Sequence, residues 1–347
     1  MPAKTPAAHA STLLAMPADH PAALTAFWFA GTRESAPDVQ IAASQFDRGQ
    51  QRWSEAQIVV TREWLGEQLG FGVRRLGNPV AWLDASGRMH LWVVATGAGG
   101  WAASRIAHLR QTRPPAQTAP RTQATQPDRR PEPAPLQFEV ERVLPLSWMW
   151  NTSYLVRNAP LSTQDGGMLL PVHFELGIKY PVALRFDPKG KFKDMVRMSG
   201  RTRVLQPSLL ALDAQHWLAL MRNQSPQAQI AVAESRDAGR SWQDRPDLGL
   251  SNPDAAVAAL ALGRQSLLLA HNTGGSRAQL TLSHSADGLQ WHTLKVLAQG
   301  GPGAEFSYPA LAWADGSLWV SYTEQRQRIA WQRFDMPTRA AQGSAGP

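Results

Sequence analysis

The stretch Ser235-Arg-Asp-Ala-Gly-Arg-Ser-Trp242 decides the fold, because it encodes a turn that organises itself. Asp237 can accept hydrogen bonds from nearby backbone N–H groups, and Gly239 permits a positive φ. Trp242 then offers a large apolar ring to the edge of a sheet. Looser copies of the stretch lie at 44–53 and 285–291. Three such turns in one chain predict an internal repeat.

A longer pattern of short strand, tight turn and apolar strand recurs six times along the chain. One copy begins at Asn78-Pro79, turns at Asp84–Gly87 and continues as the apolar run Met89–Val94. The apolar runs are short, bounded by turn residues and rich in Val, Leu and Trp, which is typical of buried strands. The last four copies lie about 50 residues apart, the size of a four-stranded blade. We therefore expect an all-β, six-bladed β-propeller; a β-sandwich or two small β-domains are the alternatives.

The propeller is expected to form one closed domain over residues 8–335. Residues 110–137 are rich in Pro, Gln and Arg and poor in apolar residues, so we expect a disordered insertion there. Residues 336–347 are expected to form a flexible tail. The insertion has five Arg against one Asp and one Glu, so much of the excess behind the net charge of +8 lies there, which argues against a folded nucleic-acid groove.

Composition excludes several classes of site. The chain has no Cys, which rules out disulfides, zinc thiolate sites and thiol catalysis. No segment approaches the roughly 18 uninterrupted apolar residues of a membrane helix. No metal-ligand spacing stands out, so neither a metal nor a cofactor is expected. No signal peptide is visible, and a periplasmic, secreted or cytoplasmic location and any oligomeric state are compatible with the sequence.

Polar side chains should meet at one rim of the propeller, where the innermost strands begin and the second strands end. The residues that open the first strands are His9, Asn78, Asn158, Gln206, Asn252 and Tyr308. Those at or beyond the ends of the second strands include Arg33, Asp38, Glu175, Arg222 and Arg277. An Asn or Gln before Pro can instead cap a strand, and an Arg at a strand end can simply reach solvent. Two guanidinium groups that face one cavity, however, suit a carboxylate ligand.

Three further segments carry a resemblance to a known family: Ala26–Glu34, Gln206–Leu209 and Phe306–Leu311. With these segments and the Ser235–Trp242 turn, the chain resembles the sialidase superfamily, in particular its bacterial BNR-repeat, neuraminidase-like branch. The resemblance implies a six-bladed propeller and a retaining exo-glycosidase. In that family three arginines hold the substrate carboxylate, an Asp acts as acid and base, and a Glu activates a Tyr nucleophile.

Carried over by position, the resemblance implies roles for four residues. Asp38 corresponds to the acid/base, Tyr308 to the nucleophile, and Arg222 and Arg277 to the second and third arginines. Two positions depart from the family pattern. His9 stands where the first arginine is usual, and Gln206 stands where the Glu is usual. Because a Gln cannot accept the phenolic proton, we expect an altered active site.

The leading hypothesis is a sialidase-like exo-glycosidase that removes a terminal acidic sugar, sialic acid or a relative, from a glycan. The expected catalytic residues are Asp38, Tyr308 and Glu175, since His173 and Glu175 alternate onto one face of a strand end. The expected substrate-binding residues are Arg33, Arg222, Arg277, Gln206, His9 and Asn78. The alternatives are a non-catalytic glycan-binding propeller and a hydrolase or lyase of the same fold for another polysaccharide, using Glu175 or Glu305. A carboxylate within hydrogen-bond reach of the Tyr308 hydroxyl would favour hydrolysis, and its absence would favour binding.

Overall fold

The computed structural model describes residues 1–2, 4–112, 135–148, 151–226 and 228–335. Within these residues the strands form six antiparallel sheets, which we number as blades 1 to 6 in chain order. Blade 1 contains β1 (Ala7–Ala15), β2 (Ala22–Gly31), β3 (Gln40–Asp47), β4 (Arg52–Trp53) and β5 (Gln57–Val60). Blade 2 contains β6 (Arg75–Leu83), β7 (Met89–Thr96), β8 (Ser104–Gln111) and β9 (Phe138–Val143). Blade 3 contains β10 (Tyr154–Val156), β11 (Leu161–Ser162), β12 (Met168–Leu176), β13 (Ile178–Phe186) and β14 (Phe192–Arg197).

The C-terminal half of the chain supplies the other three blades. Blade 4 contains β15 (Val204–Ala211), β16 (Trp217–Asn223), β17 (Ala231–Ser235) and β18 (Gln243–Arg245). Blade 5 contains β19 (Ala258–Gly263), β20 (Ser266–Asn272), β21 (Gln279–Ser285) and β22 (His292–Gln299). Blade 6 contains β23 (Phe306–Ala314), β24 (Ser317–Glu324) and β25 (Arg328–Asp335).

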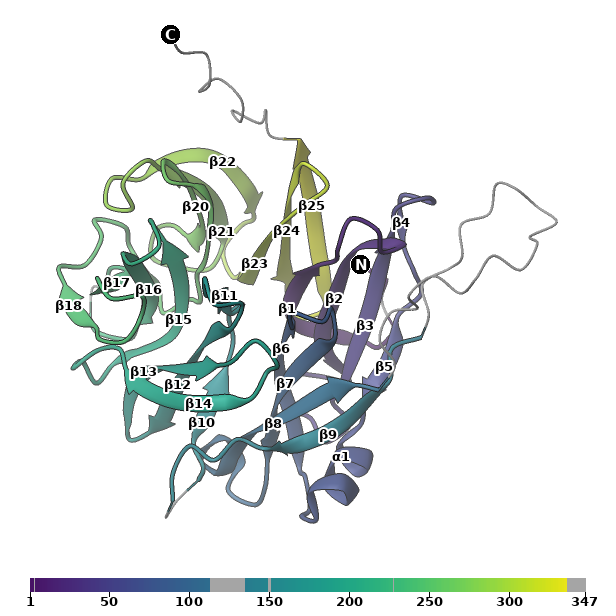
Figure 1. Ribbon diagram of the computed structural model, residues 1–347. Helices are drawn as coiled ribbons and strands as arrows, with labels where there is room; N and C mark the ends of the chain where they lie inside the picture. The colour runs from purple at the N-terminus through teal and green to yellow at the C-terminus, as the bar shows by residue number, and fades with distance from the viewer. Residues whose placement is uncertain (3, 113–134, 149–150, 227, 336–347) are drawn as a thin grey trace, which may run out of the picture.

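The six blades close into a ring around a common centre (Figure 1). Their inner strands contact one another in sequence: β1 with β6, β6 with β10, β12 with β15, β15 with β19, β19 with β23, and β23 with β1. The expected six-bladed propeller is therefore confirmed. Each blade is covered on both faces by its neighbours, which explains strands that are apolar along their whole length, such as β2 with all ten residues buried. Between blades 2 and 3, for example, the rings of Trp92 and Phe186 meet at 5.2 Å.

The turn at Ser235–Trp242 forms as its sequence predicts. The Asp237 carboxylate accepts from the backbone N–H groups of Arg240 and Ser241 at 3.0 and 2.8 Å, and the Trp242 indole N–H donates to the Gly239 carbonyl at 3.2 Å. The copy at 285–291 makes the same contacts around Asp287 and Trp291. The copy at 44–53 differs, because its first residues lie in strand β3 and not in a turn.

The position of this turn distinguishes the two ends of blade 4. Ser235 ends β17 opposite Trp217, the first residue of β16. Arg222 lies near the other end of β16, so the turn sits at the opposite end of the blade from Arg222. We call the end that carries Arg222 the rim.

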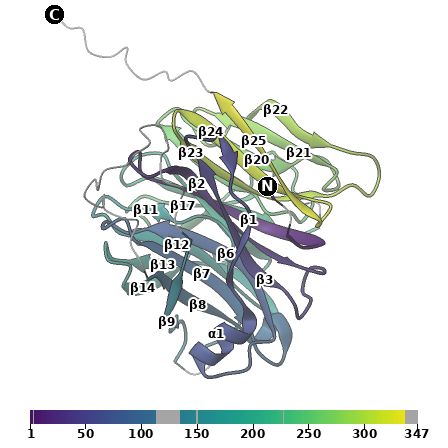
Figure 2. The same cartoon turned by 90° about the vertical axis from the view of Figure 1, so that its right-hand side faces the viewer.

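One helix was not predicted from the sequence. Helix α1 (Arg62–Leu69) begins after Thr61, whose side chain accepts from the Trp64 N–H, and ends at Gly70 with a φ of 69°. It lies beside β9 at the outside of blade 2 (Figure 2), where Leu65 is buried in the same core cluster as Phe138. No helix in the described ranges is long and apolar enough to cross a membrane.

Residues at both ends of the expected insertion belong to the folded domain. Strand β8 runs to Gln111 and Arg110 pairs with Glu139 at 2.9 Å, so the first two residues assigned to the insertion belong to the sheet. Leu136 is buried, so the last part of the expected insertion also joins the core. Residues 113–134, and the expected tail at 336–347, lie outside the described residues.

Candidate functional site

The innermost strands carry bulges at the rim, and these bulges present the candidate site residues. The strand pairing shifts register between Leu205 and Ser208 in blade 4 and between Ser307 and Ala310 in blade 6. Gln206 and Tyr308 occupy these bulges, and both have a φ of 53°. A positive φ is costly for a side chain of this size, and a following proline disfavours it further, so the surrounding structure must hold both residues in place. The repeated residue-Pro pair therefore marks a bulge, where a strand tolerates proline.

The Tyr308 hydroxyl lies among hydrogen-bond donors. The Gln206 Nε2 amide donates to it at 3.4 Å, while the Gln206 Oε1 atom accepts from Arg222 Nη1 at 3.2 Å. The Arg157 guanidinium lies over the Tyr308 ring at 4.9 Å, and the His9 ring packs against it at 4.4 Å. No described carboxylate contacts the Tyr308 hydroxyl. Tyr308, Gln206, Arg222 and His9 are thus brought together as expected.

A network of ion pairs continues from this group along the rim. Arg222 Nε donates to Asp254 Oδ1 at 2.6 Å, and Arg277 Nη1 donates to Glu305 Oε1 at 3.0 Å. Arg326 bridges blades 1 and 6, because it donates to Glu305 Oε2 at 2.8 Å and also pairs with Glu34. We call the whole set the rim cluster; its members are His9, Glu34, Arg157, Gln206, Arg222, Asp254, Arg277, Glu305, Tyr308 and Arg326.

The rim cluster is positively charged and open to solvent. Its four guanidinium groups outnumber its three carboxylates by one. Burial alone would raise the pKa of Glu305, but Arg326, Ser307 and Arg277 lower it to about 2. Hydrogen bonding to Arg222 likewise outweighs burial and lowers the pKa of Asp254. The side chains of Asp254 and Arg326 are 47% and 45% exposed, so a ligand can reach the cluster.

His9 lies inside the cluster, but not at the bulge. In blade 1 the positive φ belongs to Ala10, and His9 pairs in register with Phe29. The prediction that His9 occupies the same repeat position as Tyr308 is therefore wrong by one residue. Its ring is buried and neither nitrogen has a hydrogen-bond partner, although Glu34 lies 3.8 Å from Nε2. Burial, with Arg326 and Arg157 nearby, lowers the pKa of His9 to about 3, so the ring is neutral near pH 7.

Asp38 and Arg33 lie on the loop that follows β2. The Asp38 carboxylate accepts from the backbone N–H and the hydroxyl of Thr32 at 2.9 and 3.0 Å, which closes the loop. Both Asp38 and Arg33 are exposed. Neither has a described contact with Tyr308 or Arg222, so the loop places the two residues at the rim without joining them to the cluster.

Glu175 forms a separate group with its neighbours in blade 3. Its Oε2 atom lies 3.4 Å from His173 Nε2, and its Oε1 atom accepts from Lys179 at 2.8 Å. Although burial opposes ionisation, His173 and Lys179 lower the pKa of Glu175 to about 2. Glu175 is therefore a carboxylate near neutral pH, and no described contact links it to Tyr308.

Asn78 and Asn158 tie neighbouring blades together. The Asn78 amide donates to the Val156 carbonyl at 3.0 Å, which joins blade 2 to blade 3. The Asn158 amide donates to the carbonyls of Gln206 and Pro207 at 2.9 and 3.0 Å, which holds the bulge of blade 4. Asn252 instead caps its own turn through Ala255. All three amides bond to backbone, which is the capping role that the sequence had left open as an alternative.

Two members of the cluster were missed in the sequence. Arg157 follows strand β10 of blade 3, yet it donates to the Pro309 carbonyl at 2.8 Å and to the Ser11 carbonyl at 3.4 Å, so it joins blade 3 to blades 6 and 1. Asp254 directly follows the Asn252-Pro253 pair and has a φ of 49°. Arg157 directly precedes Asn158, and Asp254 directly follows Pro253. Their closeness to these repeat positions is the sequence signal that could have identified them.

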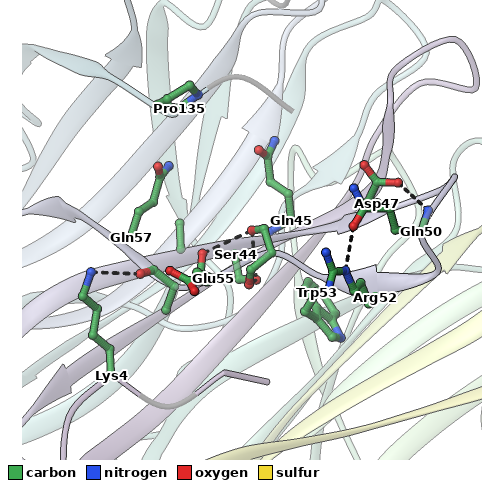
Figure 3. Close-up of a pocket in the computed structure, with 13 residues that line it drawn as sticks. Lys4, Ser44, Gln45, Asp47, Gln50, Arg52, Trp53, Glu55, Gln57 and Pro135 are labelled. Atoms are coloured by element: carbon green, nitrogen blue, oxygen red, sulfur yellow. Dashed lines mark hydrogen bonds between the residues drawn. The ribbon is translucent and has the colours of Figure 1, made fainter. Parts of the chain in front are cut away.

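A pocket of about 550 Å³ lies away from the rim, where β4 and β5 leave a gap along the edge of β3 (Figure 3). Both of its cations are engaged locally: Lys4 donates to the Ala56 carbonyl at 3.1 Å, and Arg52 donates to Gln50 at 2.6 Å. Across the described residues, no group of three or more His, Cys, Asp or Glu could hold a metal ion.

Comparison with solved structures shows which fold this is. A Hadza microbial sialidase, Hz136, is 15% identical with a TM-score of 0.71, over 95% of this chain and 66% of that one. A Trypanosoma rangeli sialidase in complex with sialic acid is 11% identical with a TM-score of 0.70, over 95% and 54%. A protein of unknown function from Dyadobacter fermentans is 13% identical with a TM-score of 0.69, over 96% of both chains.

The chain thus spans about half to two thirds of the length of these two sialidases. A search of curated proteins finds no match. The sequence profile of the BNR repeat-like domain matches residues 22–320, from the start of β2 into β24. The chain belongs to the family of BNR repeat-like domains, and its propeller is that of the sialidases.

Proposed function

We propose that the rim cluster binds a terminal acidic sugar, sialic acid or a relative of it. The observation that carries the proposal is the convergence of Arg157, Arg222 and Arg277 around the bulge that holds Tyr308. A guanidinium group matches a carboxylate in shape and charge, and several of them on one rim favour an anionic ligand. The sialic acid complex of the Trypanosoma rangeli sialidase, which has the same fold, supports this choice of ligand class.

The internal carboxylates leave donors free for a ligand. A guanidinium group has five N–H donors. The described side-chain contacts of Arg222 use Nε and Nη1, while those of Arg277 use Nη1 and Nη2. Asp254 and Glu305 therefore orient the arginines, and the remaining N–H groups can donate to a second carboxylate. His9 is neutral and both of its ring nitrogens are buried, so it supports Tyr308 by packing and does not contact the ligand.

Hydrolysis of that sugar, with an altered site, is the second candidate, and the strained backbone at Tyr308 favours it. Strained residues collect at active sites, and a donor from Gln206 with a cation over the ring would stabilise negative charge on a tyrosine nucleophile. Asp38 would act as acid and base from its loop. Gln206 cannot accept the phenolic proton, however, and His9 with a pKa of about 3 is a weak base. The geometry therefore supports binding ahead of turnover.

Catalysis by Glu175 or Glu305 on another polysaccharide receives less support. Both carboxylates are held in ion pairs, and both have a pKa of about 2. A general acid needs a pKa near the operating pH, which neither group provides.

Calorimetric titration with sialic acid tests the proposal. We expect saturable binding by the wild type and roughly tenfold or weaker affinity in Arg222→Ala, because charge-assisted hydrogen bonds are lost. Arg264→Ala removes one exposed charge at the opposite end of a blade and should leave the affinity unchanged. If no acidic sugar binds the wild type, the proposal is wrong.

An aryl glycoside of sialic acid tests the second candidate in the same preparations. Turnover that disappears in both Tyr308→Phe and Asp38→Ala would establish hydrolysis. Binding without turnover by the wild type would leave the protein as a glycan-binding propeller.

A further inference from the structure

A second concentration of arginines lies on the rim between blades 1 and 2. One pocket of about 430 Å³ is lined by Arg62, Arg74 and Arg75 together with the loop Gly97–Gly100. A pocket of about 740 Å³ on the other side of the same loop is lined by Arg74 and Arg105, with an apolar part formed by residues such as Phe71 and Leu176. The two pockets share Arg74 and Gly97–Gly99, and we call them together the arginine groove.

The arginine groove has almost no negative charge to balance its cations. No Asp or Glu lines either pocket. Arg62 pairs with Glu63 at 2.6 Å, whereas Arg74, Arg75 and Arg105 have no carboxylate within 4.0 Å in the part of the chain that the structure describes. In the rim cluster, by contrast, Arg222, Arg277 and Arg326 each have a carboxylate partner. Like charges gathered without counter-charges repel one another, and a bound anion relieves that repulsion.

The loop Gly97–Gly100 lets the guanidinium groups approach from both sides. A Cβ placed on Gly97 would lie 3.7 Å from Arg105 Nη1, and one on Gly100 would lie 3.9 Å from Arg75 Nη1. Gly99 and Gly100 have φ values of 107° and 65°, which side chains disfavour. A ligand can therefore contact backbone as well as arginine along this loop.

The arginine groove adjoins the rim cluster through one loop. Glu34 belongs to the cluster, while Pro37, three residues later on the same loop, lines the groove. Trp101, just beyond Gly100, packs on Gly77 beside the bulge of Asn78, where a Cβ on the glycine would lie 2.8 Å from the ring. A chain of sugars that leaves the rim cluster past this loop enters the groove.

We propose that the arginine groove binds a second anionic group, a carboxylate or a sulfate, of an acidic oligosaccharide whose terminal sugar occupies the rim cluster. The proposal rests on the function proposed above and names its ligand more closely: an oligosaccharide with at least two negative charges. Leu176, which is 47% exposed, offers an apolar surface to the face of a sugar ring. Single-stranded nucleic acid is the less suitable polyanion, because its bases stack on open aromatic rings and the ring of Phe71 already has Arg105 over it at 4.8 Å.

Titration of the full chain with four ligands tests this. The ligands are a galacturonic acid tetrasaccharide, a chondroitin sulfate tetrasaccharide, a neutral maltotetraose and a single-stranded oligonucleotide. The variant is Arg74→Ala/Arg75→Ala. Its control is Arg240→Ala/Arg264→Ala, which removes the same charge at the opposite end of the blades, and thermal unfolding checks that both variants fold.

We expect at least one acidic tetrasaccharide to bind the wild type and the control equally, and to bind the Arg74/Arg75 variant roughly tenfold to a hundredfold more weakly. The maltotetraose should not bind. A preference for the galacturonic acid tetrasaccharide then indicates a carboxylate, and a preference for the chondroitin sulfate tetrasaccharide, which carries both groups, indicates that the sulfate contributes. Equal affinity in the two double variants, no binding of either acidic tetrasaccharide, or tighter binding of the oligonucleotide would each overturn the proposal.

Arg222→Ala separates this proposal from the function on which it rests. Binding that depends on Arg222 but not on Arg74 and Arg75 would mean that the rim cluster works without the groove. Binding that depends on Arg74 and Arg75 but not on Arg222 would mean that the arginine groove binds the tetrasaccharide without the rim cluster. Free sialic acid, a single sugar, should bind the Arg74/Arg75 variant as well as it binds the wild type.

Discussion

Arg157 shows how much one residue contributes to the rim. It is buried, it has no described carboxylate partner, and it donates to carbonyls of blades 1 and 6 while lying over the Tyr308 ring. Burial lowers its pKa, to about 10, which still leaves the group charged near pH 7. Because Arg222, Arg277 and Arg326 face carboxylates, Arg157 supplies the positive charge that the cluster has in excess.

Replacing Arg157 by Met separates its charge from its volume. The side chains are similar in length, and removing a buried charge offsets the lost hydrogen bonds, so we expect unfolding free energy to change by less than about 1.5 kcal/mol. Affinity for an acidic sugar should fall roughly tenfold, because the cluster loses its excess charge. Arg157→Ala, which leaves a cavity, should cost about 2–4 kcal/mol. Urea unfolding and titration measure both effects, and full affinity in Arg157→Met would contradict this role.

At the scale of elements, the turn at Ser235–Trp242 and the bulges at the other end of the blades have different purposes. The turn closes β17 onto β18 and lies at the opposite end of the blade from Arg222. The bulges turn Gln206 and Tyr308 into the rim cluster. A change in the turn should therefore affect stability and leave binding intact.

Asp237→Ala tests this separation. It removes the acceptor of two backbone N–H groups and of the Ser235 and Ser241 hydroxyls, so we expect a loss of about 1–2 kcal/mol of unfolding free energy. Asp194→Ala, which removes a mostly exposed carboxylate 3.9 Å from Arg185, is the matched control and should change stability by less than about 0.5 kcal/mol. Denaturant unfolding gives both values. An effect of Asp237→Ala on ligand affinity would show that the two ends of the blade are coupled.

The strand positions were predictable because turn residues and apolar runs repeat, and each run lies inside a strand of the ring. Tyr308, Gln206, Arg222 and His9 were expected to meet for the same reason, and they do. The details that failed depend on contacts between blades. The one-residue shift at Ala10 is set by the pairing of His9 with Phe29, and the position of Arg157 is set by carbonyls more than 140 residues away. A repeat pattern read within one blade carries no information on either of these contacts.

At the scale of the whole molecule, buried neutral histidines make the fold sensitive to acid. Mainly because they are buried, His9 has a pKa lowered to about 3 and His271 has a pKa lowered to about 4. Burial also lowers the pKa of His108 well below 6.5. In the unfolded chain these rings bind protons below about pH 6.5, whereas in the folded chain they do not until the pH is far lower. Their contribution to stability is therefore complete above pH 6.5 and decreases as the pH falls toward 4.

We expect the unfolding free energy to fall between pH 6 and 4.5 by about 1.4 kcal/mol per pH unit for each such histidine. The paired carboxylates Glu175 and Glu305, with a pKa of about 2, add to the loss only at lower pH. Urea unfolding at pH 7.5, 6 and 4.5 measures the slope. His271→Gln should reduce it and the exposed control His292→Gln should not. Equal stability at pH 7.5 and 4.5 would contradict the assignment of buried neutral rings.

A crystal structure of the protein soaked with sialic acid shows most directly whether the rim cluster binds an acidic sugar. We expect electron density for the sugar beside Tyr308, with its carboxylate within hydrogen-bond distance of Arg222 or Arg277. Density for the sugar elsewhere, or an empty rim at a concentration that saturates binding in solution, would contradict the proposal.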